Sequence, residues 1–286
     1  MMNGRIQPEL PVSELPTITR ILVKSIRTRV EKVGAQGGLV ALSGGIDSSL
    51  VALLTQRALG DRMLALIMPE EGVTPEWDLR DALNLVEQHR IPHRVIAINE
   101  AVHLFQRYMP DQDVPESVQR LALANVKPRV RMILNYLYAN LLGFIVVGTS
   151  NKTELLLGYG TKYGDLAADI YPIGDLYKTQ VWQLAEYLGL PANIIKKKPS
   201  AGLWKGQTDE EELGHTYAEI DRVLYCLVDL ELSVRETSQV LNLPEEAVLD
   251  IYQRVIRNEH KRRTPTITRI SSMCLDKDWR YPVERY

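Results

Sequence analysis

Short apolar runs alternate with helix-like patterns through the first half of the chain. Four short runs are predicted to form strands: residues 39–42, which are expected to be buried, 64–68, 93–98 and the entirely apolar 144–148. Residues 48–59 and 75–89, which lie between them, show helical spacing. Apolar strands separated by helices are typical of a parallel sheet covered on both faces. The pattern therefore predicts an α/β fold with a doubly wound, Rossmann-like parallel sheet, in a core of about residues 20–200.

A long helical region follows the third strand, at residues 118–142. Pro128 interrupts it, so we expect a break near Ala124 and a new helix capped by Asn125, with Pro128 tolerated in the first turn. Apolar residues surround much of the second helix. Such a helix is usually buried on more than one side, either in the core or against a second subunit.

The C-terminal part is predicted to be helical, at about residues 205–262. The expected helices are 209–214, 217–229, 233–241 and 245–260, and the expected loops are 202–206 and 264–278. Thr208 and Ser233 each stand three residues before a glutamate, which is the spacing of a capping box. We expect the parallel-sheet core, this helical part and a tail (263–286) to form one domain over residues 1–286.

Bulk composition excludes several classes of protein. The formal net charge is −2, so nothing suggests binding to nucleic acid. The two cysteines, Cys226 and Cys274, lie far apart, which argues against a disulfide framework or a zinc site. The first sixteen residues lack the apolar segment of a signal peptide, and no apolar run approaches the roughly 20 residues of a membrane span. We therefore expect a soluble cytoplasmic protein that binds no membrane.

The most informative stretch follows the first strand and reads Ser43-Gly44-Gly45-Ile46-Asp47-Ser48. A glycine turn between a strand and a helix N-terminus presents backbone N–H groups to an anion. Ser43, Ser48 and Ser49 add hydroxyl donors, and the Gly-Lys-Ser/Thr ending of a Walker A loop is absent. Asp47 places a carboxylate inside this phosphate cradle. A carboxylate at this position makes sense if Mg²⁺ lies between the carboxylate and the phosphate. The stretch resembles the pyrophosphate loop of ATP pyrophosphatases; the alternative is a plain turn with a helix N-cap.

A second polar tract, residues 148–178, comes directly after the most apolar strand. Glu154 stands early in the following helix and can point back toward Asp47, giving Mg²⁺ a second oxygen ligand. Residues 158–169 are rich in Gly, Tyr and Asp without a periodic pattern. Their place at the carboxyl edge of the sheet predicts a substrate-facing segment rather than an ordinary solvated loop.

Together these tracts resemble the ammonia-dependent NAD⁺ synthetases. Eight tracts occur in family order: residues 42–49 (Leu-Ser-Gly-Gly-Ile-Asp-Ser-Ser), 125–132, 148–154, 158–165, 172–181, 198–204, 207–214 and 259–262. Pro128 replaces the usual alanine, and most of the tail matches nothing in the family. The resemblance implies ATP-dependent amidation of nicotinic acid adenine dinucleotide to NAD⁺. ATP would adenylate the nicotinate carboxylate with release of pyrophosphate, and free ammonia would displace AMP.

The resemblance also assigns roles to residues. It implies ATP binding by Leu42, Ser43, Gly44, Gly45, Ile46, Asp47, Ser48, Thr149, Lys178 and Ser200. It implies Mg²⁺ binding by Asp47 and Glu154, and dinucleotide binding by Arg129, Lys162, Asp169, His260 and Lys261. Asp47, Asp165 and Lys178 would be catalytic, with Asp165 steering ammonia. Without the resemblance, Thr149 is equally a strand-end hydroxyl, Lys178 a solvated lysine, Ser200 a turn residue, and His260 part of a basic helix end.

The resemblance further implies a homodimer that shares the dinucleotide site, with Arg129 near the seam. Two other classes of function remain open from the residues. Another enzyme with the same loop, such as a tRNA thiolase or lysidine synthetase, would need a basic RNA-binding surface or catalytic cysteines. A non-catalytic protein that binds adenine nucleotides would need neither Glu154 nor the tract at 158–169.

Overall fold

The computed structural model describes residues 6–110, 113–200, 202–204 and 206–274. At its centre a parallel sheet has the strand order β3-β2-β1-β4. The strands are β1 (Gly37–Ala41), β2 (Met63–Ile67), β3 (His93–Val95) and β4 (Phe144–Val146). All four predicted strands are present, and each ends sooner than the apolar pattern indicated. Polar residues of the site therefore begin directly at the carboxyl edge of the sheet.

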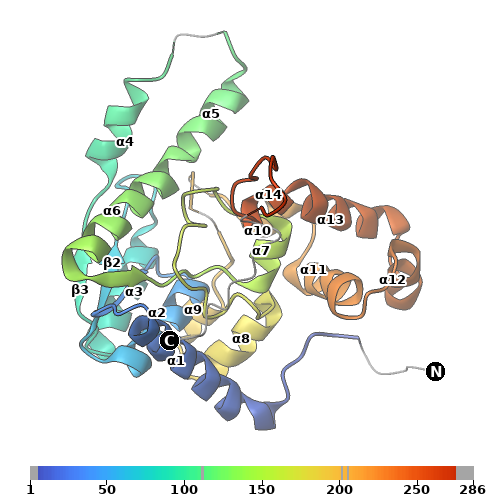
Figure 1. Cartoon of the computed structure of the whole chain (residues 1–286), viewed down its shortest axis with the longest axis horizontal. Coiled ribbons are helices and arrows are strands. Elements are labelled where there is room, and N and C mark those ends of the chain that lie inside the picture. The colour runs from blue at the N-terminus through green and yellow to red at the C-terminus, as the bar shows by residue number, and fades with distance from the viewer. Residues whose placement is uncertain (1–5, 111–112, 201, 205, 275–286) are drawn as a thin grey trace.

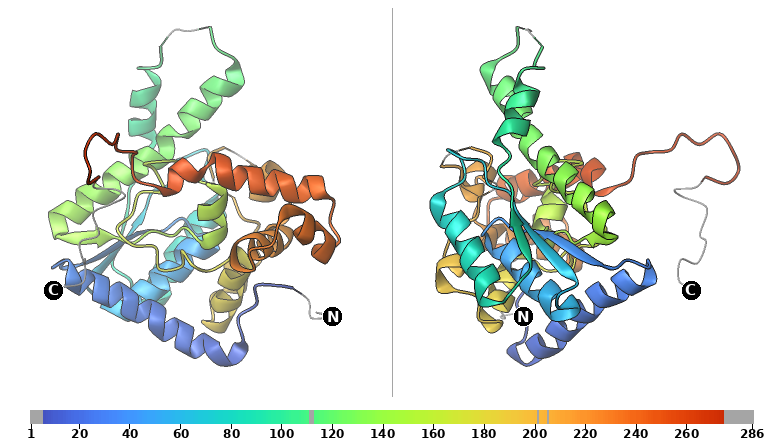
Figure 2. Two further views of the ribbon diagram at one scale, coloured as in Figure 1. Left: turned by 45° about the vertical axis from the view of Figure 1, so that its right-hand side comes forward. Right: turned by 90° about the vertical axis from the view of Figure 1, so that its left-hand side faces the viewer.

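Helices cover both faces of this sheet (Figures 1 and 2). One face carries α2 (Ile46–Leu59) and α3 (Glu76–Gln88), with α1 (Leu15–Lys32) and α8 (Lys178–Tyr187) packed beside α2. The other face carries α4 (Asn99–Gln106) and α6 (Val126–Leu142). The first helix begins after the short 3-10 turn η1 (Val12–Glu14), and α9 (Ala192–Ile195) follows α8. The doubly wound parallel sheet predicted from the sequence is confirmed.

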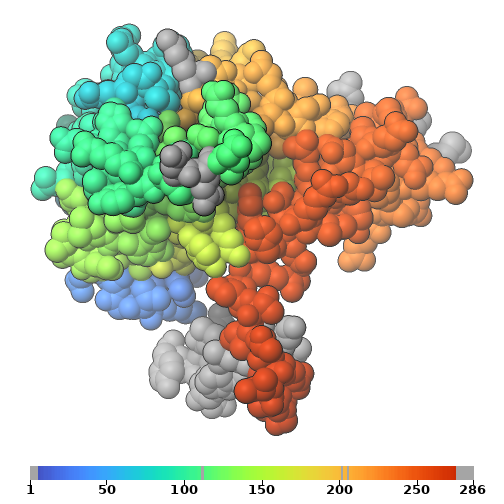
Figure 3. All heavy atoms as spheres, turned by 90° about the horizontal axis from the view of Figure 1, so that it is seen from above, coloured from blue at the N-terminus to red at the C-terminus, as the bar shows by residue number. Residues whose placement is uncertain are grey.

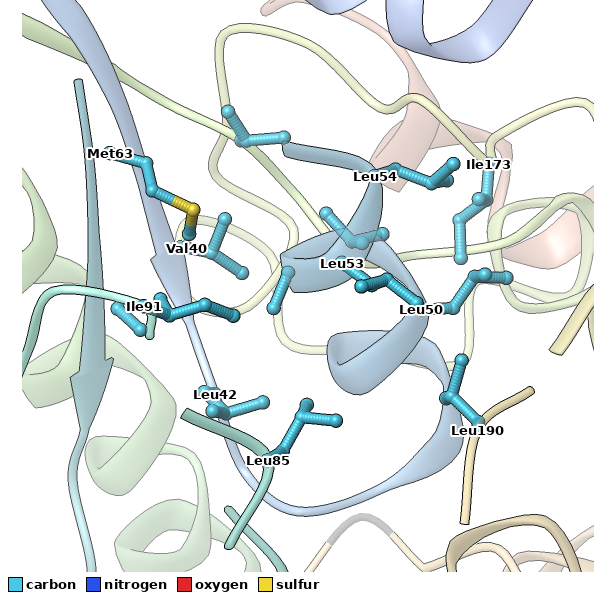
Figure 4. Packing of buried hydrophobic residues seen from close by; sticks show 14 of the residues in the cluster. Val40, Leu42, Leu50, Leu53, Leu54, Met63, Leu85, Ile91, Ile173 and Leu190 are labelled. Carbon is cyan, nitrogen blue, oxygen red and sulfur yellow. The ribbon is translucent and has the colours of Figure 1, made fainter. Parts of the chain in front are cut away.

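Side chains alternate between the two faces along each strand, as the pleat requires. In β2, Met63 and Ala65 pack toward α2, whereas Leu64 and Leu66 pack toward α6. Figure 4 shows the α2 side, where Val40 of β1 and Leu53 of α2 belong to one apolar cluster. Because β1 pairs with β2 on one side and with β4 on the other, the strand order reverses at β1. In open α/β sheets ligands bind beyond the carboxyl ends of the strands at such a point.

The break predicted near Ala124 is confirmed, but the predicted cap is wrong. Helix α5 (Glu116–Ala124) ends there and α6 begins at Val126, with Pro128 buried in its first turn. Asn125 has a helical backbone, and its side chain does not cap α6. Its Oδ1 instead accepts a hydrogen bond from Thr161 Oγ1 at 2.8 Å. The amide therefore ties the start of α6 to the predicted substrate-facing segment.

Part of α6 carries large apolar side chains that the described residues leave exposed. Ile133, Leu137 and Leu141 are 51%, 50% and 73% exposed, and Leu121 of the preceding α5 is 56% exposed. The part of the chain that the structure describes thus buries one side of this helix, through residues such as Val130. The sequence predicted that the apolar residues of α6 pack in the core or against a second subunit. One side of α6 packs in the core, and the other side is exposed.

The C-terminal part builds a second apolar core from its own helices (Figure 1). These are α10 (Asp209–Leu213), α11 (Tyr217–Leu224) with a π-helix η2 (Tyr225–Asp229), α12 (Val234–Leu241) and α13 (Glu245–Arg257). The short α14 (Glu259–Arg262) follows α13 and buries no side chain. This core also includes Leu157 of α7 (Lys152–Leu157) and Tyr177, so it rests against the helices that follow the sheet. Ser233 and Glu236 form the predicted capping box, whereas Thr208 makes no side-chain cap bond, which corrects that prediction.

Beyond α14 the chain is exposed from Arg263 to Met273 and projects from the body (Figures 2 and 3). The predicted loop at 264–278 agrees with this as far as residue 274, and the rest of the tail lies outside the described residues. No helix in the described part of the chain has the length and apolar character that crossing a membrane requires.

Candidate active site

The glycine turn after β1 forms a compact set of hydrogen bonds. Ser43 N donates to Ser48 Oγ at 3.2 Å, and the Ser43 and Ser48 hydroxyls lie 3.0 Å apart. Ser48 Oγ donates to Gly45 O at 3.1 Å, which closes the turn onto the start of α2. Gly44 has φ +84°, and an added Cβ would lie 2.2 Å from Asp78 O. Only glycine fits at that position, so the loop backbone keeps the tight path that an anion cradle needs.

Ser49 does not belong to the cradle, contrary to the sequence prediction. Its side chain is fully buried, and its hydroxyl has no hydrogen-bond partner among the described residues. In a helix that is buried almost all round, a position next to Ser48 points about 100° away from it. The third predicted hydroxyl donor therefore faces the core instead of the loop.

Lys178 joins the two predicted metal-binding carboxylates. Its Nζ lies 2.5 Å from Asp47 Oδ2 and 3.2 Å from Glu154 Oε1, and the lysine side chain is 2% exposed. Asp47 stands in the first turn of α2, Glu154 in the first turn of α7, and Lys178 begins α8. Asn151 Nδ2 also donates to Asp47 Oδ1 at 2.9 Å. Three helix N-termini thus bring these groups to one point.

The electrostatics of this cluster follow from its burial. Burial by itself lowers the pKa of Lys178, but the nearby Asp47 and Glu154 carboxylates outweigh burial and hold that pKa above its ordinary value. Burial raises the pKa of the Glu154 carboxyl, and the positive charge of Lys178 opposes this. The ammonium between two carboxylates shows that the position suits a cation. Two hard oxygen donors beside a phosphate loop fit Mg²⁺, which usually binds one or two carboxylates together with phosphate oxygens.

A buried carboxylate on α11 accepts hydrogen bonds from residues next to Glu154 and Lys178. Asp221 is fully buried and accepts hydrogen bonds from Thr153 Oγ1 at 2.5 Å, Thr179 N at 2.7 Å and Thr179 Oγ1 at 2.8 Å. Thr153 Oγ1 in turn accepts from Lys178 N at 2.9 Å. Because Thr153 precedes Glu154 and Thr179 follows Lys178, Asp221 fixes the backbone on which both of those groups stand.

The tract at 158–169 lies against the site, as predicted. Asp165 Oδ1 accepts from Thr161 N at 2.9 Å. Burial raises the pKa of the Asp165 carboxyl, while the Thr161 hydrogen bond and the charge of Lys261 act in the opposite direction. Lys261 Nζ donates to Gly158 O at 2.7 Å and to Gly160 O at 3.0 Å. The C-terminal helix α14 therefore anchors the segment that presents Asp165.

These elements enclose a cavity of about 500 Å³ at the carboxyl edge of the sheet. Most of the predicted site residues line it: Leu42, Ser43, Gly45, Ile46, Asp47, Ser48, Thr149, Glu154, Asp165, Lys178, Ser200 and Lys261. The phosphate loop, the paired carboxylates and Asp165 thus share one space. Such a cavity can hold a nucleotide with its phosphates beside a cation and a second reactant near Asp165.

Five predicted residues do not line the cavity: Gly44, Arg129, Lys162, Asp169 and His260. Gly44 is covered by Asp78, and His260 lies exposed on α14. The other three gather near the exposed side of α6. Arg129 Nη2 donates to Lys162 O at 3.4 Å, and Asp169 Oδ2 accepts from Val146 N at 2.7 Å. Of the residues predicted to bind the dinucleotide, only Lys261 therefore lines the cavity. The other four, Arg129, Lys162, Asp169 and His260, lie outside it.

Sequence reasoning missed several residues of the cavity wall. Arg131, two positions after the predicted Arg129, lines the cavity and donates to Met68 O at 3.1 Å. Asp209 and Glu212 also line it, and both accept from the Tyr159 hydroxyl, at 3.0 and 2.9 Å. Tyr159 lines the cavity as well, and these four residues lie within tracts that resemble the family. The resemblance to the family therefore pointed to the right tracts. The sequence alone does not show which residue of each tract faces the cavity.

Comparisons with known proteins agree on one family. The family model described as NAD synthase matches residues 18–265. An NH(3)-dependent NAD(+) synthetase of Archaeoglobus fulgidus is 47% identical over 249 residues, which cover 87% of this chain and 94% of that protein.

Solved structures agree as well. The NH3-dependent NAD synthetase of Campylobacter jejuni is 34% identical, with a TM-score of 0.74 and coverage of 89% of this chain and 99% of that one. A structure from Francisella tularensis described as an NMN synthetase has a TM-score of 0.77 at 35% identity, and covers 90% of this chain and 99% of that one.

Proposed function

Since the chain belongs to the NAD synthase family, we infer that it is a ligase that makes NAD⁺ from nicotinic acid adenine dinucleotide, ATP and ammonia. The observation that carries this function is the contact of Lys178 with both Asp47 and Glu154 at the end of a phosphate loop. A non-catalytic nucleotide-binding protein would need neither the second carboxylate nor Asp165. A tRNA-modifying enzyme, the other alternative from the sequence, gains no support from the comparisons.

In the first step a nicotinate carboxylate oxygen would attack the α-phosphorus of ATP, and pyrophosphate would leave. We propose that Gly45 N–H and the Ser43 and Ser48 hydroxyls hold the phosphates, with Lys178 neutralising charge at the leaving group. Asp47 and Glu154 would hold Mg²⁺, which supplies positive charge to the polyphosphate. The same residues keep the reactants in line, which is the main task in phosphoryl chemistry.

In the second step ammonia would attack the carbonyl carbon of the adenylate, AMP would leave, and the nitrogen would lose a proton. We propose that Asp165 orients ammonia and accepts that proton. Its buried carboxylate has a raised pKa, which improves a proton acceptor near neutral pH. Thr161 N–H holds the carboxylate at the cavity wall while this happens.

The dinucleotide would extend from the cavity to the surface beside α6. Lys261 would contact the part in the cavity, and Arg129, Lys162, Asp169 and His260 the part outside. We propose that the uncovered apolar side of α6 packs on a second copy of the chain, which would bring the seam close to Arg129. The single-domain organisation and the cytoplasmic location remain predictions from the sequence.

One experiment tests the proposed function together with the alternative that the enzyme acts on the mononucleotide. The enzyme is incubated with ATP, Mg²⁺ and ammonium, and with either nicotinic acid adenine dinucleotide or nicotinic acid mononucleotide. We expect NAD⁺ formation from the dinucleotide at the higher kcat/KM, with one pyrophosphate released per NAD⁺. A preference for the mononucleotide would instead assign the activity named for the Francisella tularensis structure. It would also leave Arg129 and Lys162 without the role proposed for them.

A further inference from the structure

A lysine on the segment after α9 reaches the phosphate loop. Lys197 Nζ donates to the backbone carbonyl of Gly44 at 2.9 Å and lies 2.6 Å from Asp78 Oδ1 and 2.5 Å from Asp81 Oδ2. An ammonium group has three donors, and these three acceptors account for all of them. Lys197 lines the cavity, but its charge is already balanced by two carboxylates. It is therefore placed to hold the loop rather than to bind phosphate itself.

The contact with Gly44 has a geometric consequence for Gly45. A peptide bond is planar and trans, so the Gly44 carbonyl and the Gly45 N–H point in opposite directions. Because Lys197 holds the carbonyl on one side, the N–H is directed to the other side. There it donates to Ser43 Oγ at 3.3 Å, beside the Ser48 hydroxyl. Ser43, Gly45 and Ser48 all line the cavity.

Within the loop, the described residues give this peptide one hydrogen bond, the long 3.3 Å bond from Gly45 N to Ser43 Oγ. Glycines stand on both sides of it, and glycine adopts left-handed and extended backbone conformations with similar ease. Gly44 has φ +84° and Gly45 has φ −81°. The shorter bond to this peptide, from Lys197 Nζ to Gly44 O at 2.9 Å, comes from outside the loop and favours one of its two orientations. Among the described residues, Lys197 is the side chain that bonds the Gly44 carbonyl.

We propose that Lys197 is a positioning residue that holds the Gly44–Gly45 peptide with its N–H toward the ATP phosphates. Asp78 and Asp81 orient the lysine, and Asn193 Nδ2 fixes Asp81 through a 2.5 Å hydrogen bond. This inference rests on the proposed function, because it takes the ATP polyphosphate as the anion that the N–H meets. It extends the site to α3, which carries both carboxylates.

The test measures the affinity of the full chain for MgATP and for magnesium pyrophosphate by calorimetry. Lys197→Met keeps the length of the side chain but loses the ammonium, and Lys196→Met removes the same charge from an exposed neighbour outside the cavity. We expect Lys197→Met to weaken both affinities by about tenfold, the effect of losing one well-placed hydrogen bond to an anion. Affinity for nicotinic acid adenine dinucleotide should not change. The ¹⁵N shift of the Gly45 amide should move in Lys197→Met and stay constant in Lys196→Met.

A second variant covers the case in which Lys197→Met does not fold. Asp78→Asn combined with Lys197→Met removes one of the two carboxylates that lose their cation, while Asp81 keeps its hydrogen bond from Asn193. The double variant should show the same loss of affinity and the same Gly45 shift. Variants that bind MgATP as tightly as Lys196→Met would overturn the inference and leave the proposed function standing. A wild-type chain that binds neither MgATP nor magnesium pyrophosphate would overturn both.

Discussion

Lys178 Nζ and Asp47 Oδ2 lie 2.5 Å apart although 131 positions separate the two residues in the chain. The contact joins the first turn of α2 to the first turn of α8. Since Lys178 also bonds Glu154, one buried ammonium holds both carboxylates beside the phosphate loop. This arrangement explains why an acidic pair can persist in a buried place before a metal and a polyphosphate bind.

Asp47→Asn should abolish adenylation while preserving the fold. The amide keeps the shape of the side chain but removes the charge that faces Lys178 and the proposed Mg²⁺. We expect pyrophosphate release to fall at least about 100-fold, as for the loss of other electrostatic groups at reacting phosphates. Asp250→Asn, on the exposed surface of α13, is the matched control. Release at near wild-type rate in Asp47→Asn would rule out the metal-binding role.

Asp165→Asn should impair the second half-reaction more than the first. The asparagine amide can still accept from Thr161 N, so the segment keeps its place, but it cannot take a proton from nitrogen. We expect amide formation to slow by about 100-fold or more, with a smaller effect on pyrophosphate release. Rapid-quench measurement of both products decides the matter, and equal losses would remove the proposed ammonia role.

The same substitution should make the protein more stable near neutral pH. Burial raises the pKa of the Asp165 carboxyl in the folded protein, whereas an unfolded aspartate titrates at about 3.9. The wild-type free energy of unfolding therefore falls as pH rises from that value through the raised folded pKa. Asp165→Asn does not titrate and escapes this loss. Tm measured against pH should show a gap that grows from acid to neutral pH; a constant gap would contradict the raised pKa.

Asp221→Ala should destabilise the protein by about 3 kcal/mol, because it leaves three donors, one on buried Thr153 and two on half-buried Thr179, without their acceptor. Thr237→Val offers the contrast. Thr237 is equally buried in the same C-terminal core, but its hydroxyl has no partner among the described residues, so its loss should be nearly neutral. Chemical denaturation gives both values. If the two variants lost similar amounts of unfolding free energy, the bonds to Asp221 would contribute little to stability.

Leu137→Glu should yield a monomer and weaken binding of the dinucleotide. The side chain is 50% exposed on the uncovered side of α6, where the second copy is proposed to pack. Val240→Glu, at an apolar side chain that is 49% exposed on α12, is the control for adding a charge elsewhere. Sedimentation at micromolar concentration measures the state of each variant. A fully active wild-type monomer would overturn the proposed dimer.

The sequence predicts the sheet well because β1, β2 and β4 are apolar and mostly buried and are bounded by glycine, proline and polar residues, whereas the edge strand β3 (His93–Val95) is short and exposed. The phosphate loop and Glu154 follow from local order along the chain. The contact of Asn125 with Thr161 and the burial of Ser49 could not be predicted, since each depends on segments that meet only in the fold. The contacts of Arg131 and Lys197 could not be predicted for the same reason, because their partners, Met68 O and Gly44 O, are backbone atoms distant in sequence.

In the proposed reaction, ATP activates the nicotinate carboxylate as an adenylate. Nicotinic acid adenine dinucleotide labelled with ¹⁸O in both carboxylate oxygens tests it most directly. If a carboxylate oxygen attacks the α-phosphorus and ammonia then displaces AMP, mass spectrometry will find one ¹⁸O in each AMP and one in each NAD⁺ amide. Formation of ADP and phosphate, or of AMP without the label, would contradict the account.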